Sequence, residues 1–131
     1  GVDLVKDVTV LEAAYNDEAG VTAEFNRNIL RVINRTLHAD FRPEAFRHYA
    51  CFNGEESRIE MHLIPESPQT VHLRDLDLRV DISPDETIWT ESSYKFTRES
   101  VTEMLDDAGL RPERWHTDSN DSFALVLATP K

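Results

Sequence analysis

TESSYKF, residues 90–96, is the stretch around which the predicted fold is arranged. Its polar and apolar side chains alternate, and in a β-strand successive side chains point to opposite faces of the sheet. The alternation divides the region into two faces: Trp89, Glu91, Ser93 and Lys95 on one, and Ile88, Tyr94 and Phe96 on the other. The sequence therefore predicts a strand over residues 87–96.

A carboxylate and a hydroxyl on one strand face can bind the same polar ligand. Glu91 can accept a hydrogen bond from an N–H group, and Ser93 can donate or accept one. The alternative is that this face is simply solvated, because antiparallel sheets commonly expose one polar face. Lys95, one step further along the same face, should matter little if it lies beyond the pocket.

Two other alternating stretches precede this strand. They are RIEMHLI, residues 58–64, and LDLRVDI, residues 76–82, and a shorter one covers residues 71–73. The connections between them are too short for crossover helices, so an antiparallel meander is predicted.

Helical patterns flank the strands on both sides. Asp7 can cap a helix over residues 8–15, and apolar residues at helical spacing predict a longer helix over residues 22–37. Thr97 can cap a third helix that ends near Gly109. A short helical segment at residues 44–46 and a terminal hairpin over residues 114–127 complete the prediction. The expected fold class is α+β, with helices packed on an antiparallel sheet.

Composition excludes several kinds of protein. The chain has 131 residues, of which 40% are hydrophobic and 30% charged, so a folded domain is expected. The net charge of −11 argues against nucleic acid and anionic membranes as partners. No apolar run is long enough to span a bilayer and no signal-peptide pattern is present. Cys51 is the single cysteine, which favours a cytoplasmic location, and we expect it to be a small buried residue.

No common catalytic or metal-binding motif is present. The five histidines lack close ligand spacing, although His62 and His72 could face each other on paired strands. There is no glycine-rich dinucleotide or phosphate loop and no nucleophile elbow. We therefore predict no metal site and no catalytic residue in this chain. Tyr15 and Met61 are interpreted from the pattern alone as core residues.

Three separate stretches resemble one family. AYNDEAGVTAEFNRNIL (14–30), RIEMHL (58–63) and TESSYKF (90–96) are similar to the carboxy-terminal part of the histidine-specific methyltransferases, and the resemblance covers essentially the whole chain. In that family a Rossmann-like class I domain binds S-adenosylmethionine and an inserted domain binds histidine. The resemblance implies three parts: residues 1–6 end a strand of the methyltransferase domain, residues 7–96 bind histidine, and residues 97–131 are the terminal helix and strand pair.

The resemblance also assigns roles to residues. It implies that Glu91 and Ser93 read the imidazole, that Tyr15 holds the substrate carboxylate, that Met61 lines the pocket and that Thr22 lies at its rim. The implied reaction is trimethylation of the α-amino group of L-histidine, at the start of ergothioneine biosynthesis. Rival interpretations are a methyltransferase for another amino acid, such as tryptophan, and a non-catalytic binding or assembly module.

The glycine-rich loop that binds S-adenosylmethionine in that family has no counterpart among residues 1–131. We therefore expect a carboxy-terminal fragment that is inactive alone and whose partner is an amino-terminal methyltransferase part. We also expect residues 1–6 and 123–127 to pair with each other, to pair with another molecule, or to lie loosely, because exposed strand edges recruit partners. Self-association or local disorder is therefore expected at these ends.

Overall fold

The computed structural model describes all residues, 1–131, and shows an α+β fold. Three α-helices are present: α1 Val8–Tyr15, α2 Val21–Leu37 and α3 Arg98–Asp107. The strands are β1 Val2–Asp3, β2 Phe46–Asn53, β3 Arg58–Pro65, β4 Gln69–Leu73, β5 Leu78–Ile82, β6 Ile88–Tyr94, β7 Leu110–Thr117 and β8 Phe123–Pro130. Short 3-10 helices lie at Pro43–Ala45 and Arg74–Leu76. None of these helices has the length and apolar character needed to cross a membrane.

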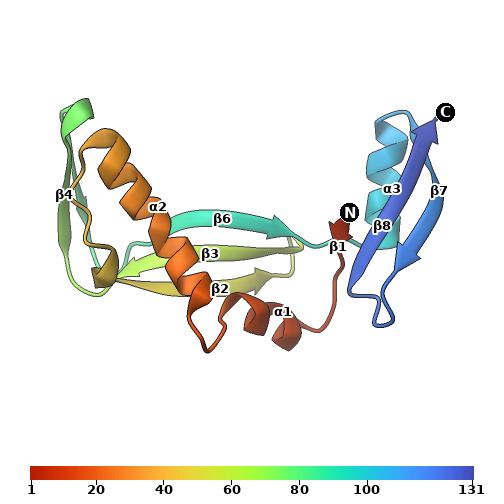
Figure 1. The fold of residues 1–131 in the computed structure, drawn as a ribbon, viewed down its shortest axis with the longest axis horizontal. Helices are drawn as coiled ribbons and strands as arrows, with labels where there is room; N and C mark the ends of the chain where they lie inside the picture. Colours follow the sequence, from red (N-terminus) through yellow and green to blue (C-terminus); the bar gives the residue numbers. More distant parts are fainter.

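The strands form three antiparallel sheets rather than one meander. Their orders are β2-β3-β6, β4-β5 and β1-β8-β7. β4 and β5 pair only with each other, so His72 does not face His62 as the sequence allowed. In Figure 1 the molecule is elongated, with β4 at one end and α3, β7 and β8 at the other, while α1 and α2 lie over the β2-β3-β6 sheet.

The core lies between the two helices and the β2-β3-β6 sheet. Leu11 of α1 packs with Ala50, Ile59 and Met61, and Leu30 of α2 packs in a second cluster with Phe46, Leu63 and Ile82. β3 alternates strictly between half-buried and buried positions, so one whole side of it faces the helices.

The helix ends follow the predicted capping. The Asp7 carboxylate accepts a hydrogen bond from the Thr9 amide at 2.8 Å, and Thr97 forms a capping box with Ser100. Gly20, at φ 71°, precedes α2, whose first turn is held by Asp17. Not all of the apolar residues whose spacing predicted α2 enter the core, because Phe25 stays 65% exposed.

A β-bulge in β6 changes which side chains of residues 88–96 share a face of the sheet, relative to the prediction. Met61 pairs with Glu91 but His62 pairs with Trp89, so Thr90 is left as an extra residue. Two opposed residues share a face, so Glu91 lies on the Met61 side and Trp89 lies on the outer side. The prediction that Trp89 shares a face with Glu91 is therefore wrong.

The same register overturns two other expectations about this strand. Ile88 is opposite buried Leu63, whereas Tyr94 is opposite Arg58 on the outer face, so Ile88 and Tyr94 do not share a face. Ser93 is opposite buried Ile59. The face that carries Glu91 and Ser93 is the one covered by helices, and not a fully solvated face.

The outer edge of β2 is covered by side chains from α1 and its end. The Asn16 amide donates to the Ala50 carbonyl at 3.0 Å and accepts from the Ala50 amide at 3.2 Å. The Glu12 carboxylate accepts from the Phe52 amide at 3.0 Å. These contacts satisfy backbone groups that an edge strand otherwise presents to other molecules.

Replacing Asn16 with alanine should therefore lower the free energy of unfolding by about 1.5–4.5 kcal/mol, since its side chain loses three hydrogen bonds, the two to Ala50 and one to the Glu12 carbonyl. Urea unfolding of the chain measures this. Asn120→Ala, in the exposed turn between β7 and β8, is the matched control and should leave stability unchanged. Equal midpoints for parent and Asn16→Ala would show that this edge needs no side-chain cover.

The first residues connect the two ends of the molecule. β1 pairs with β8, with Val2 opposite Ala124, so the two terminal segments pair with each other. The Val5 amide donates to the Phe96 carbonyl and the Phe96 amide donates to the Asp3 carbonyl, both at 2.9 Å. The two stretches that join the β1-β8-β7 sheet to the rest of the chain therefore contact each other, and in Figure 1 they come together near β1.

Candidate functional site

Glu91 and Met61 line a small cavity between α2 and the sheet. Its volume is about 180 Å³, and half of its lining is hydrophobic. The lining residues are Phe25, Asn26, Asn28, Ile29, Val32, Met61, Thr90 and Glu91. We call this space the Glu91 cavity. An aromatic ring of five or six atoms suits its size better than a large cofactor does.

The carboxylate of Glu91 is free to bind a ligand. The Trp89 indole donates a hydrogen bond to the backbone carbonyl of Glu91 at 3.0 Å. The carboxylate oxygens of Glu91 take no part in this bond and remain unused. Met61 beside it is buried, with 2% exposure, and supplies an apolar wall. The cavity therefore joins one uncompensated negative charge to an apolar surface.

Ser93 lies on the same strand face as Glu91 but outside the lining of this cavity, in a hydrogen-bonded group of its own. Its Oγ lies 2.8 Å from the Tyr15 hydroxyl of α1 and 2.9 Å from the Lys95 ammonium. Lys95 also donates to the Tyr15 hydroxyl at 2.8 Å and pairs with the Asp3 carboxylate at 2.8 Å. We call these four residues the Lys95 network.

Lys95 lies outside the lining of the Glu91 cavity but is buried and bonded to Ser93. Its side chain has 0% exposure, while that of Asp3 is 35% exposed. Burial alone disfavours the ammonium, but hydrogen bonds to Asp3 and Tyr15 outweigh it and raise the pKa of Lys95. Burial likewise opposes ionisation of Asp3, and its bonds to Lys6 and Lys95 prevail and lower its pKa. The pair is therefore charged on both sides.

Two residues that sequence reasoning missed hold the helices against the sheet near this site. Asn26, 3% exposed, donates to His48 Nδ1 at 2.9 Å and to the His62 carbonyl at 3.1 Å. His48 Nε2 then donates to the Tyr15 carbonyl at 2.7 Å. The signal in the sequence was an asparagine among the apolar residues of α2.

Thr22 lies in the first turn of α2, outside the lining of the Glu91 cavity. Its amide donates to the Asp17 carboxylate at 2.8 Å. Hydrogen bonds from the Thr22 side chain and amide lower the pKa of Asp17 to about 2. The structure therefore places Tyr15 with Ser93 and Met61 with Glu91, and leaves Thr22 apart from both pairs.

One group of side chains has the chemistry of metal ligands. Cys51, Glu60 and His62 lie on the outer face of the sheet, with donor atoms within 4.8 Å of one another. Glu60 is already paired with Arg58 at 2.9 Å, so the group is explained as an ion-pair network. Cys51 itself is half-exposed and not buried as expected.

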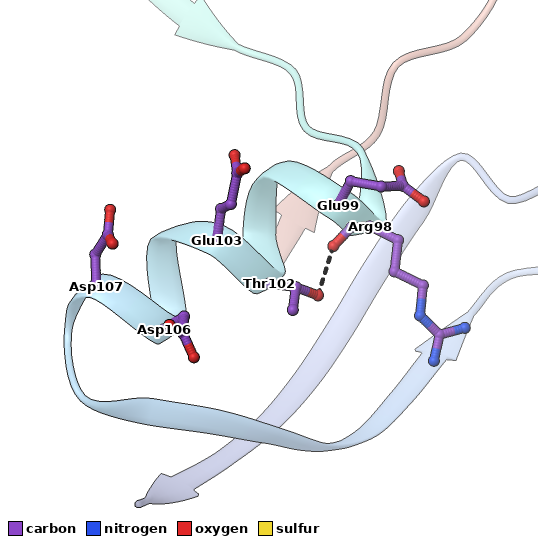
Figure 2. A pocket seen from close by; sticks show the side chains of 6 residues that line it. All are labelled: Arg98, Glu99, Thr102, Glu103, Asp106 and Asp107. Atoms are coloured by element: carbon purple, nitrogen blue, oxygen red, sulfur yellow. Dashed lines mark hydrogen bonds between the residues drawn. The ribbon is translucent and has the colours of Figure 1, made fainter.

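The largest hollow lies elsewhere and has a different character. It measures about 510 Å³ beside α3, and Figure 2 shows its lining along one helix face. The lining residues are Arg98, Glu99, Thr102, Glu103, Asp106 and Asp107, none of them hydrophobic. This is an open acidic surface with nothing to hold an adenine ring. This hollow therefore does not fit S-adenosylmethionine. The Glu91 cavity does not fit it either, because its volume is below the roughly 300–1,000 Å³ usual for cofactor sites.

Comparison with known proteins gives the family. Residues 1–130 match the family described as "Histidine-specific methyltransferase, SAM-dependent". This chain belongs to that family. The histidine N-alpha-methyltransferases of Mycolicibacterium smegmatis and Mycobacterium tuberculosis (strain CDC 1551 / Oshkosh) are 51% and 50% identical to it, each over 128 residues. The match covers 98% of this chain but 40% of each relative, so the chain spans about two fifths of the length of these histidine-specific methyltransferases.

Proposed function

We propose that this chain is the histidine-recognising part of an S-adenosylmethionine-dependent histidine Nα-methyltransferase. The observation that carries the proposal is the free Glu91 carboxylate on the helix-covered face that also holds Ser93. Membership of the histidine-specific family supports the substrate class. The proposed reaction is stepwise trimethylation of the α-amino group, which would begin ergothioneine biosynthesis.

Recognition would use the two polar groups together. Two residues along a strand separate Glu91 from Ser93 by about 6.7 Å between Cα atoms, which leaves room for an imidazole between their side chains. Met61 would pack on the ring, and the Tyr15 hydroxyl would donate to the substrate carboxylate. Thr22 would lie at the rim. An indole carries one N–H group and no basic nitrogen, so the pair favours histidine over tryptophan.

The same proposal assigns histidine binding and cofactor binding to different parts of the protein. Residues 7–96 would bind histidine, and residues 1–6 and 97–131 would belong to a methyltransferase domain that binds the cofactor. The relatives extend beyond the matched region by more than half of their length. When bound, S-adenosylmethionine supplies the methyl group, and the residues described here orient the acceptor amine by holding the other end of the substrate.

The 131-residue chain alone should therefore give no methylated histidine with labelled S-adenosylmethionine, whereas the full-length enzyme should. Mass spectrometry of the product counts the methyl groups and distinguishes trimethylation from a single transfer. Tryptophan, offered in parallel, should not react. Turnover by the isolated chain above blank would refute the proposed division of the work, and a full-length protein that binds no histidine would refute the substrate.

A further inference from the structure

The Lys95 network contains a fixed number of hydrogens, and this number limits what Ser93 can offer a ligand. The Lys95 ammonium has three hydrogens, and its three acceptors are Asp3 Oδ2, Tyr15 Oη and Ser93 Oγ, at 2.8, 2.8 and 2.9 Å. None of its hydrogens remains for a substrate. Each hydroxyl oxygen thus gives one lone pair to Lys95.

The two hydroxyls also bond to each other, at 2.8 Å. That bond uses one of their two hydrogens and one further lone pair. Between them, the Tyr15 and Ser93 hydroxyls have one hydrogen and one lone pair left to direct outward, one on each oxygen. If Tyr15 presents the hydrogen, then Ser93 must present the lone pair, and the reverse also holds.

A bound amino acid decides between the two arrangements. Its carboxylate accepts hydrogen bonds and cannot donate them, and a charge-assisted bond from a phenol is stronger than the neutral bond between the two hydroxyls. Tyr15 would therefore direct its hydrogen to the substrate carboxylate. Ser93 would then donate to Tyr15, accept from Lys95 and turn its remaining lone pair toward the substrate ring.

We infer that the site binds histidine with a doubly protonated imidazole, and that Tyr15, by accepting the Ser93 hydrogen, makes Ser93 an acceptor toward the ring. This inference rests on the proposed function. Glu91 and Ser93 then both accept, and a cationic imidazole is the form that offers two N–H groups. The unpaired carboxylate of Glu91 agrees with it, because a half-buried negative charge is stabilised by a cation.

The other charged groups near the proposed ring position are paired with each other, so they do not change the preference for a cationic imidazole. Asp3 of β1 and Lys95 of β6 neutralise each other, and Lys6 pairs with the other oxygen of Asp3. His48 of β2 is turned to the Tyr15 carbonyl and to Asn26. Glu91 is therefore the charged group that meets the ring directly.

The test is NMR of ¹⁵N-labelled histidine bound to the full-length enzyme. At about pH 7.5 free histidine is roughly nine-tenths neutral, since its ring has a pKa of about 6.5. The expected result is an imidazolium spectrum for bound histidine at that pH. The triazole analogue of histidine stays neutral between about pH 5 and 8 and should bind at least tenfold more weakly.

Two variants separate the network from a general structural effect. In Tyr15→Phe, Ser93 loses the oxygen that accepts its hydrogen and is free to donate to the ring, so bound histidine should give a neutral spectrum at the same pH. In Lys95→Met, Ser93 still donates to Tyr15, so the imidazolium spectrum should persist. Lys6→Met, which removes another cation from Asp3 but no bond to Ser93, is the control and should keep the imidazolium spectrum. Tyr15→Phe provides the test even if Lys95→Met does not fold.

A neutral ring bound to the parent enzyme, or an imidazolium that persists in Tyr15→Phe, would overturn the inference while leaving histidine as the substrate. Absence of any histidine signal from the parent enzyme would instead overturn the proposed function, and this inference with it.

Discussion

Histidine should bind the Glu91→Ala variant of the full-length enzyme roughly ten- to a hundredfold more weakly than it binds the parent. The reason is the loss of a charge-assisted hydrogen bond, with a net contribution of about 1.5–3 kcal/mol. Calorimetric titration measures the change. Ser93→Ala should have a smaller effect, because a neutral hydrogen bond contributes about 0.5–1.5 kcal/mol.

Ser92→Ala is the matched control for this series. Ser92 is opposite Glu60 on the outer face of β6, is exposed, and shares the chemistry of Ser93 without its position. Its affinity for histidine should equal that of the parent. Parent-like affinity in Glu91→Ala would show that this carboxylate does not read the imidazole.

Replacing Asp3 with alanine should have a large effect on stability. The change leaves the Lys95 ammonium, with 0% side-chain exposure, without its anionic partner. Removing one partner of a buried ion pair lowers the free energy of unfolding by about 3–5 kcal/mol. Because Asp3 is 35% exposed, we expect a loss at or below the lower end of this range. Urea unfolding measures the loss. Lys6→Ala, which removes the more exposed partner of Asp3, should cost less than about 1 kcal/mol.

The stability lost in Asp3→Ala should depend on pH in a defined way. The folded state lowers the pKa of Asp3, so its contribution is present above the unfolded value of about 3.9 and fades as pH falls through the lowered one. The folded state raises the pKa of Lys95, so its contribution holds below about 10.4 and fades as pH rises through the raised value. A deficit that stays constant down to about pH 2 would exclude this ion pair as its cause.

Local patterns were enough to predict the helices and most strands, because caps and periodicity act over a few residues. Asp7, Thr97 and Gly109 stand where the sequence placed them. The strand β2 was missed because its outer face carries Tyr49 and Cys51, so polar and apolar residues do not alternate cleanly.

The predicted site was incomplete because its closest contacts join distant parts of the chain. The Tyr15–Ser93 bond spans 78 positions and the Lys95–Tyr15 bond spans 80. No periodicity encodes such contacts. The bulge at Thr90 depends on pairing with β3, so strict alternation assigned Trp89 to the wrong face. The alternation placed Glu91 and Ser93 on one face and the resemblance gave them their roles, but neither indicated what holds Ser93.

The side-by-side pairing of residues 4–5 with Phe96 has a mechanical consequence. Two parallel connections that share hydrogen bonds should resist twisting more than a single linker does, so we expect the two ends of the molecule to tilt more readily than they rotate about each other. Because Asp3 lies at this joint and also holds Lys95, a tilt that opened the joint would loosen the proposed histidine site at the same time. The amide protons of Val5 and Phe96 would then exchange with solvent at the rate of that opening. Their hydrogen-exchange rates would therefore measure how often the contact between the two connections opens.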